Sequence, residues 1–322
     1  MKLSIIIPVY QVEEYIERCL KSIISQDCKD YEIILVDDAT RDNSMQIAHD
    51  VLDNTGIIVR YLKHEANSGL SAARNTGIRA AQGDYLLFVD SDDSLADGAL
   101  SAFIRQINDT DADCIIGNYK VVSDTGDYIS KKYDYYRCFH SLNDIAETYR
   151  NGSIPVMAWN KCVKASLVRD KKLYFKEGIY HEDELWTFLL INEVASLVVT
   201  GIYTYTYYVR GGSIMTNAKM EKRLQSSISV YGEMVNYVLI NHTNNKFVLD
   251  SLDIFAFWRY RDIFKLCKCN SLAKQYYYDV RNCQKKVKRG AGKFGIVAVM
   301  HLLLPKTIGF YALGLLMKIY SK

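Results

Sequence analysis

The stretch YLLFVDSDDS, residues 85–94, decides the expected fold because its apolar run ends in three carboxylates, Asp90, Asp92 and Asp93. A continuous apolar run of this length is typical of a strand covered on both faces, as in a parallel sheet. Crowded acids repel one another unless a positive group lies between them. Ligands of open α/β sheets bind beside the carboxyl ends of the strands. We therefore expect a site here, occupied by a divalent cation that carries a phosphate.

The composition is that of an ordinary globular protein. The 322 residues are 49% hydrophobic and 24% charged, with a net charge of +3. This near balance argues against a nucleic-acid-binding protein, which usually carries a strong basic excess. The first ten residues have too short an apolar run and too early a proline for a signal peptide, and no cysteines have Cys-x-x-Cys spacing. We expect a cytoplasmic protein with reduced thiols.

Strand-like and helix-like patterns alternate over the first third of the chain. Such alternation predicts βαβ units, which form a mostly parallel sheet flanked by helices, as in Rossmann-like α/β proteins. The predicted strands cover residues 3–10, 32–38, 56–62 and 84–90, and the predicted helices cover 12–24, 45–51 and 69–83. We expect one compact domain over residues 1–215 and a helical extension over 216–322.

The extension contains a basic cluster at 279–289, followed by apolar runs at 294–304 and 308–317. Neither run reaches the roughly 20 residues that a helix needs to span a bilayer. The runs either pack as helices on the main domain or lie in the plane of a membrane, with the basic cluster facing anionic lipid. We favour the second interpretation and take 285–320 as the candidate membrane-associating segment.

Adjacent acids also end the second predicted strand, where VDDATRDNS contains Asp37 and Asp38. Helix N-capping explains one or two such acids. It does not explain two strands that each end in paired acids at one edge of a sheet. One pair can hydrogen-bond the base or ribose of a nucleotide, and the other can bind a metal that neutralises its diphosphate.

Five segments together resemble family 2 glycosyltransferases, and the resemblance covers residues 3–215. It implies the GT-A fold, inversion at the anomeric carbon and a sugar-nucleotide donor. It also implies a nucleotide-sugar half at 1–95 and an acceptor half at 96–215. In chain order the segments are SIIIPVYQVEEYIERCLKSIISQ, EIILVDDATRDNS, HEANSGLSAARNTGI, GDYLLFVDSDD and HEDELW.

The resemblance implies a role for each residue that matches a motif of the family. Asp183 matches the general base, with Glu182 as its rival, and Asp92 together with Asp90 matches the ligands of Mn²⁺ or Mg²⁺. Asp38 matches the residue that reads the nucleotide base. The residues implied to bind donor or acceptor are Pro8, Val9, Tyr10, Glu14, Asp38, Arg74, Asn75, Asp90, Ser91, Trp159, Lys161 and Arg210.

Three of these residues match elements outside the nucleotide-sugar half. Trp159 and Lys161 resemble part of the wall of an acceptor pocket, and Arg210 resembles part of a loop that folds over the diphosphate. The chain departs from the family pattern at Gln11, where Asn is usual, and in ATRD, which replaces the commoner GSTD. Both departures leave the contacts to base and ribose open.

Sugar transfer needs these residue types: a base for the acceptor hydroxyl and positive charge on the departing diphosphate. We expect an inverting enzyme that uses a UDP sugar, ahead of dTDP or GDP sugars. Its acceptor would be a hydroxyl of a glycan or a lipid-linked molecule in surface polysaccharide synthesis, such as capsule, O-antigen or exopolysaccharide. Peripheral contact with the cytoplasmic face of the inner membrane is expected, and the oligomeric state stays open.

Two alternatives belong to other classes. A sugar nucleotidyltransferase is also α/β with metal-binding acids, but it would carry a Gly-rich, Arg-containing loop after the first strand, where this chain has PVYQVEEY. A non-catalytic protein could retain the fold; the presence of Asp90, Asp92 and Asp183 argues against it.

Overall fold

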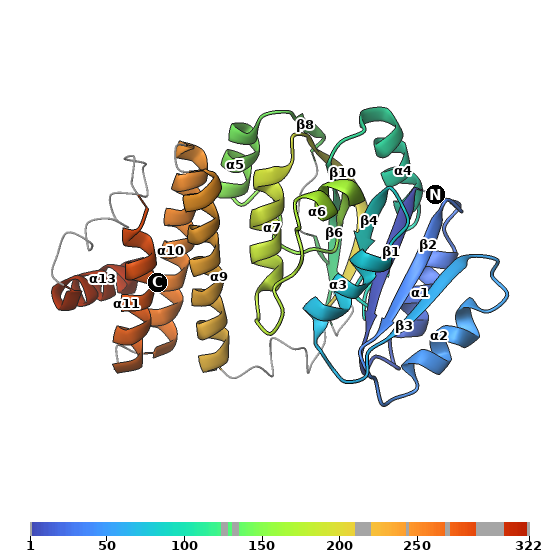
Figure 1. Cartoon of the computed structure of the whole chain (residues 1–322), viewed down its shortest axis with the longest axis horizontal. Helices are drawn as coiled ribbons and strands as arrows, with labels where there is room; N and C mark the ends of the chain where they lie inside the picture. The colour runs from blue at the N-terminus through green and yellow to red at the C-terminus, as the bar shows by residue number, and fades with distance from the viewer. Residues whose placement is uncertain are drawn as a thin grey trace. The chain divides into compact units, whose positions relative to one another are not determined.

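The computed structural model describes residues 2–123, 128–130, 135–209, 220–242, 245–267, 271–287 and 306–320. Strands and helices alternate in the first part of the chain, as Figure 1 shows. The strands are β1 (Leu3–Val9), β2 (Tyr31–Asp37), β3 (Ile58–Lys63), β4 (Tyr85–Phe88), β5 (Ser94–Leu95), β6 (Cys114–Val122), β7 (Tyr128–Ser130), β8 (Arg137–Phe139), β9 (Lys161–Lys164) and β10 (Leu197–Tyr208). The helices are α1 (Ile16–Ile24), α2 (Ser44–Leu52), α3 (Leu70–Ala80), α4 (Ala99–Thr110), α5 (Leu142–Arg150), α6 (Ala165–Asp170), α7 (Glu182–Glu193), α9 (Met220–Asn241), α10 (Lys246–Cys267), α11 (Ser271–Lys285) and α13 (Lys306–Tyr320).

The strands form one mixed sheet in the order β3-β2-β1-β4-β9-β6-β10-β5, with β7 paired to β6 and β8 paired to β10. The first four strands pair in parallel, as do β6 and β10. The other pairings are antiparallel. The expected α/β fold with a largely parallel sheet is confirmed, and β1 lies between β2 and β4, so that these three strands end side by side.

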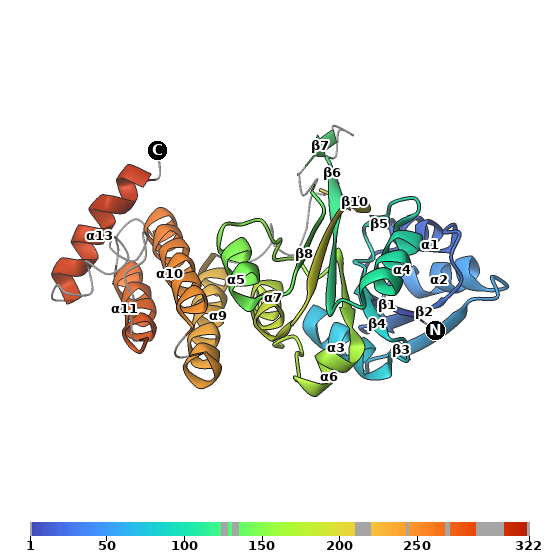
Figure 2. The same cartoon turned by 90° about the horizontal axis from the view of Figure 1, so that it is seen from above.

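Helices cover both faces of the sheet. Leu3, Ile5 and Ile7 of β1 belong to a core that also contains residues of α1, α2 and α4. The alternate residue Ile6 contacts α3. Figure 2 shows α1, α2 and α4 on one side of the sheet and α3 and α6 on the other. Because both faces are covered, β1 and β2 are buried along their whole length, which explains the uninterrupted apolar runs in their sequences.

Two glycines let the chain pack closely against β1. A Cβ atom on Gly77 of α3 would lie 2.3 Å from Cγ2 of Ile6. A Cβ atom on Gly83, in the turn before β4, would lie 2.7 Å from the backbone of Leu3 and of Ser4. Since atoms cannot approach so closely, these positions accept only glycine without local movement. The close contact places α3 directly against the strand that leads to the predicted site.

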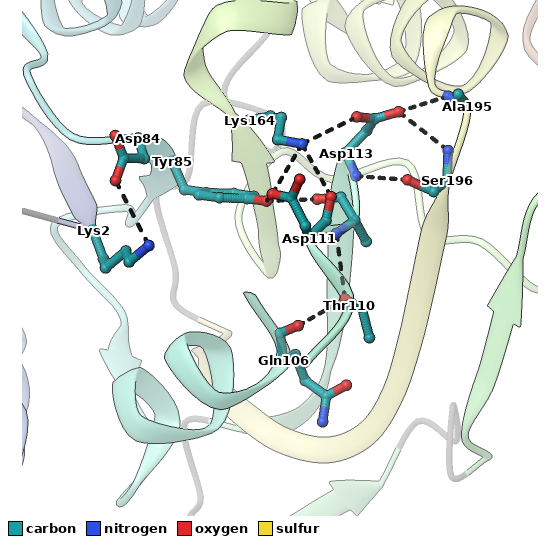
Figure 3. Close-up of polar contacts among 11 residues, drawn as sticks. Lys2, Asp84, Tyr85, Gln106, Thr110, Asp111, Asp113, Lys164, Ala195 and Ser196 are labelled. Atoms are coloured by element: carbon teal, nitrogen blue, oxygen red, sulfur yellow. Dashed lines mark hydrogen bonds and ion pairs between the residues drawn. The ribbon is translucent and has the colours of Figure 1, made fainter. Parts of the chain in front are cut away.

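A polar cluster joins the amino ends of β4, β6 and β10 (Figure 3). Nζ of Lys164 lies 3.0 Å from Oδ1 of Asp111 and 3.8 Å from Oδ1 of Asp113. The Tyr85 hydroxyl donates to Oδ1 of Asp111 at 3.2 Å, and the backbone N–H of Ser196 donates to Oδ2 of Asp113 at 3.1 Å. This end of the sheet therefore satisfies its charges internally.

The chain divides into two compact units. The first comprises residues 1–141, 156–178 and 193–213 and contains the sheet. The second comprises residues 142–155, 179–192 and 214–322. Two segments that precede residue 215 thus group with the C-terminal helices. The functional division into a catalytic domain at 1–215 and an extension at 216–322 stays a prediction.

Helices α9, α10 and α11 lie side by side in the second unit (Figure 1). A buried polar chain links α10 to α11: the Tyr260 hydroxyl donates to Gln284 at 2.9 Å, and the Gln284 amide donates to Asp253 at 3.1 Å. The ring of Phe310 in α13 packs 5.0 Å from that of Phe264. None of the described helices combines the length and the apolar character needed to cross a membrane.

Candidate active site

The acids that were predicted to lie at one edge of the sheet do lie together at that edge. Val9 at the end of β1 pairs with Asp37 at the end of β2. The backbone N–H of Asp38 donates to the carbonyl of Val9 at 3.0 Å, and that of Val89 donates to the carbonyl of Ile6 at 3.0 Å. Asp37 therefore ends β2 and Asp38 follows it, whereas Asp90 and the residues after it follow β4 at the same edge.

Asp38 is 3% exposed, and its carboxylate is surrounded by donors. The backbone N–H of Ser68 donates to Oδ1 and that of Gly69 to Oδ2, each at 2.8 Å. Nδ1 of His64 lies 2.7 Å from Oδ1, and Nε2 of His64 lies 2.9 Å from the hydroxyl of Thr76. Asp38 thus holds the turn that precedes α3, and its reading of a nucleotide base stays a prediction.

Arg74 in α3 is 1% exposed and forms an ion pair with Asp90. Nη2 of Arg74 lies 2.8 Å from Oδ1 of Asp90, whose side chain is 24% exposed. The guanidinium also lies 5.1 Å from the ring centroid of Phe175. A buried arginine therefore compensates one of the crowded carboxylates from within the protein.

Asn75 is 2% exposed and uses its amide inside the protein. Its Oδ1 accepts from the backbone N–H of Phe175 at 2.8 Å. Its Nδ2 donates to the carbonyl of Phe175 at 2.9 Å and to Oε1 of Glu177 at 3.0 Å. The geometry shows Asn75 anchoring the segment 175–177. The donor contacts predicted for Arg74 and Asn75 stay predictions.

Asp93 is fully buried and links the acidic turn to β10. The Tyr205 hydroxyl donates to Oδ2 of Asp93 at 2.8 Å and accepts from the backbone N–H of Asp90 at 3.1 Å. The backbone N–H of Tyr208 donates to Oδ1 of Asp93 at 3.0 Å. Burial, followed by the charges of Asp92 and Asp90, raises the pKa of Asp93 to about 8. Asp93 is thus a buried link between the acidic turn and β10.

Arg18 of α1 contacts the same turn from another side. Its Nη2 donates to the backbone carbonyl of Asp92 at 2.5 Å. Its guanidinium lies 3.6 Å from the ring centroid of Tyr208, the last residue of β10. The acidic turn is therefore held by α1, α3 and β10 together.

The donor set at this turn fits a hard divalent cation. Asp90 and Asp92 are half-buried carboxylates, and carboxylate oxygens are ligands that Mg²⁺ and Mn²⁺ prefer. Among the described residues, no three His, Cys, Asp or Glu side chains gather as a metal site. Mg²⁺ in proteins commonly takes one or two carboxylates and completes its shell with substrate phosphate and water.

Trp159 and Lys161 lie in the interior. Trp159 is 5% exposed, and its ring stacks on those of Tyr205 at 4.4 Å and Tyr207 at 5.7 Å between centroids. Lys161 is fully buried, and its ammonium donates to the carbonyl of Met157. Both side chains pack inside the protein in this structure. Their place in an acceptor pocket stays a prediction.

The remaining predicted residues differ in exposure. Pro8, Val9 and Ser91 are buried, whereas Glu14 is exposed and Tyr10 is 41% exposed. Asp183 is half-buried in the first turn of α7, within the second compact unit. Arg210 lies outside the described residues.

His64 and Tyr205 matched no motif with an expected role in the reaction. His64 stands in the quoted motif HEANSGLSAARNTGI, but nothing local indicates that it pairs with Asp38. A weak signal existed for Tyr205, because Tyr205 and Tyr207 alternate along β10 and therefore project from one face of the strand.

Comparison with known families agrees with this geometry. A model of the family described as Glycosyl transferase family 2 matches residues 4–173. The chain belongs to this family. The family-2 membership inferred from five short segments is therefore confirmed.

Relatives in the family come from bacteria. Glycosyltransferase GlyA of Streptococcus pneumoniae is 33% identical over 73% of this chain and 34% of its own length. The uncharacterised glycosyltransferase EpsJ of Bacillus subtilis is 32% identical over 63% of this chain and 60% of its own length. The poly(ribitol-phosphate) beta-glucosyltransferase of Bacillus spizizenii is 31% identical over 65% of this chain and 32% of its own length. The chain thus spans less than two thirds of each relative.

Solved structures support the fold of this family 2 member. Residues 1–349 of S. aureus TarS, crystallised in complex with UDP-GlcNAc, superpose with a TM-score of 0.64 at 20% identity. The match covers 89% of this chain and 91% of the TarS chain. It confirms the expected GT-A architecture.

We predict that Asn75→Ala lowers the free energy of unfolding by about 2 to 3 kcal/mol, because it removes two hydrogen bonds to buried backbone groups of Phe175. Denaturant titration measures the change. Asn67→Ala, at an exposed position of the same motif, is the matched control and should stay within about 0.5 kcal/mol of the unsubstituted chain. Equal losses in both variants would contradict the anchoring role of Asn75.

Proposed function

We propose that the chain is an inverting glycosyltransferase that moves a sugar from a UDP sugar to a hydroxyl of a glycan or lipid-linked acceptor. The observation that carries this proposal is the set of carboxylates after β2 and β4, at one edge of the sheet of a family 2 member. Family membership also favours sugar transfer over nucleotidyl transfer.

Neighbouring proteins support the choice of substrates. The TarS structure contains UDP-GlcNAc, which favours UDP as the donor nucleotide. Relatives named for poly(ribitol phosphate) and for teichoic acid poly(glycerol phosphate) favour an acceptor in the synthesis of a bacterial surface polymer.

We further propose that the enzyme depends on a divalent cation, Mn²⁺ or Mg²⁺, held by Asp92 and Asp90. When bound, the cation would neutralise charge that develops on the leaving diphosphate. Arg74 compensates Asp90 from the protein side, so that Asp92 is the carboxylate with the larger role in binding. Arg210 would add positive charge near the diphosphate.

Asp183 is the proposed general base. Its carboxylate takes the proton of the acceptor hydroxyl while the hydroxyl oxygen bonds to the anomeric carbon and the bond from that carbon to the diphosphate oxygen breaks. Attack opposite the leaving group inverts the anomeric centre.

Thermal melting tests the donor site. UDP with Mn²⁺ should raise the melting temperature, and chelator should remove most of the rise. A ligand present at a hundred times its dissociation constant adds about 2.7 kcal/mol to the stability of the folded state. Asp92→Asn should lose the metal-dependent part, whereas Asp97→Asn, an exposed acid after the same turn, should retain it. No rise with UDP, dTDP, GDP or CMP would contradict the proposed donor site.

Substitution of the base separates chemistry from binding. Asp183→Asn should lower kcat by about a thousandfold, because a positioned base contributes roughly 10² to 10⁴ in rate. The melting shift with UDP should persist. Glu182→Gln is the matched control and should stay within about tenfold of the wild-type rate. The reverse result, a large loss in Glu182→Gln alone, would transfer the role to Glu182.

We also propose that the second compact unit contacts the membrane surface. α13 buries Phe310 and Leu313, whereas Ile308 is 55% exposed and Tyr311 is 56% exposed. Lys306 is exposed at the start of α13. Exposed apolar and aromatic side chains beside lysines suit the boundary between lipid headgroups and acyl chains. Residues 288–305 of the candidate segment lie outside the described residues.

Vesicle flotation tests this contact. The purified chain should float with vesicles that contain anionic lipid and less with neutral vesicles, because the lysines favour negative headgroups. Ile308→Ser together with Tyr311→Ser should abolish flotation. Ile240→Ser, which removes an 80% exposed apolar side chain from α9, should not. Flotation that survives the double substitution would argue against α13 as the contact.

A further inference from the structure

The helix that carries the proposed base is packed with the C-terminal helices. Residues 179–192, which include most of α7, belong to the same compact unit as residues 142–155 and 214–322. The packing partners of α7 in this unit come from parts of the chain to which the sequence assigned no role in the reaction. The contacts that hold α7 within this unit come from α9 and α10.

A buried ion pair joins α7 to α10. Nη2 of Arg259 lies 2.7 Å from Oε2 of Glu184, and the two side chains are 6% and 15% exposed. Nε of Arg259 donates to the carbonyl of Ser227 in α9 at 3.0 Å. The guanidinium is thus fixed to α9 by one nitrogen and holds Glu184 with another.

The Arg259–Glu184 ion pair lies among buried side chains. Burial, and after it the charge of Glu184, raises the pKa of Tyr149, which lies in α5. Burial lowers the pKa of His181, the residue before α7. Charges attract more strongly in such surroundings than in water, so that an arginine here resists separation from its carboxylate.

The pair and a group of aromatic rings contact the same face of α7. Phe188 follows Glu184 by one helical turn, so that both project from one face of α7. The Phe188 ring packs edge-on against Phe255 at 5.7 Å and Tyr237 at 6.2 Å between centroids. Asp183 precedes Glu184 by one residue and projects about 100° away from that face. A small rotation of α7 would therefore move the carboxylate of Asp183.

We propose that Arg259 is a positioning residue for sugar transfer, which acts through Glu184 to hold the first turn of α7 and so to aim Asp183 at the acceptor hydroxyl. This inference rests on the proposed function. It gives the C-terminal helices a part in the reaction, because α9 and α10 supply the contacts that hold the base-bearing helix.

Steady-state kinetics of the full chain test the proposal. Arg259→Gln should lower kcat about a hundredfold, because small displacements of a catalytic group cost rates of that order. The KM for the UDP sugar and the melting shift with UDP should stay within about twofold, since the donor residues belong to the other unit. Arg259→Lys, which retains the charge, should recover about tenfold of the lost rate.

A matched pair in the same unit provides the control. Arg150 of α5 lies 3.6 Å from Asp250 of α10, with side chains 25% and 11% exposed, and this pair does not include α7. Arg150→Gln should keep kcat within about threefold of wild type. Unchanged kcat in Arg259→Gln, or equal losses in both variants, would overturn the proposal.

A second variant covers the case in which Arg259→Gln does not fold. Glu184→Gln combined with Arg259→Met removes both charges, which proteins tolerate better than one unpaired buried charge. This double variant should fold, bind UDP and still lose about a hundredfold in kcat; wild-type kcat would overturn the proposal. If the wild-type chain itself transfers no sugar, the proposed function fails and this inference fails with it. Normal wild-type transfer with unaffected variants overturns the inference alone.

Discussion

The desolvation of carboxylates at one edge of the sheet is the constraint on which the rest of the site depends. Asp38, Asp90 and Asp93 follow buried strands and lose much of their contact with water. A carboxylate in such a place is stable only with donors or positive charge beside it. Asp38 receives two backbone N–H groups from the turn before α3, Asp90 receives Arg74, and Asp93 receives the Tyr205 hydroxyl. These partners come from segments that are distant in the sequence from the acids. The carboxylates are therefore stabilised only once the whole sheet and its helices have folded.

Helix α3 makes two separate sets of contacts in this arrangement. Its neighbouring residues Arg74 and Asn75 project in different directions, one toward Asp90 and the other toward the segment 175–177. Gly77 lets the same helix lie directly against β1. One helix thus fixes both the acidic turn and the segment that leads along the chain to α7. This explains physically why the stretch AARNTG combines a cation, an amide and a glycine.

The second compact unit contains the helices that pack against α7. Seven of the twelve residues of α7 are buried, so this helix needs partners on more than one face. Helices α9 and α10 of the same unit supply the ring contacts of Phe188, and α10 supplies Arg259 for the pair with Glu184. Desolvation offsets much of the attraction within a buried ion pair, so such a pair adds little net stability. This favours a role in orientation.

Local pattern was enough to determine the fold class, strands β1 to β4 and the acids that follow them. Apolar runs, helical periodicity and acids at strand ends are properties of neighbouring residues, and the family motifs are equally local. Only the tertiary structure decided that Asn75 bonds to a residue 100 positions away and that Asp93 bonds to one 112 positions away. It also placed Trp159 and Lys161 in the interior. A side chain's partner depends on which distant segments the fold brings beside it, and no local pattern contains that information.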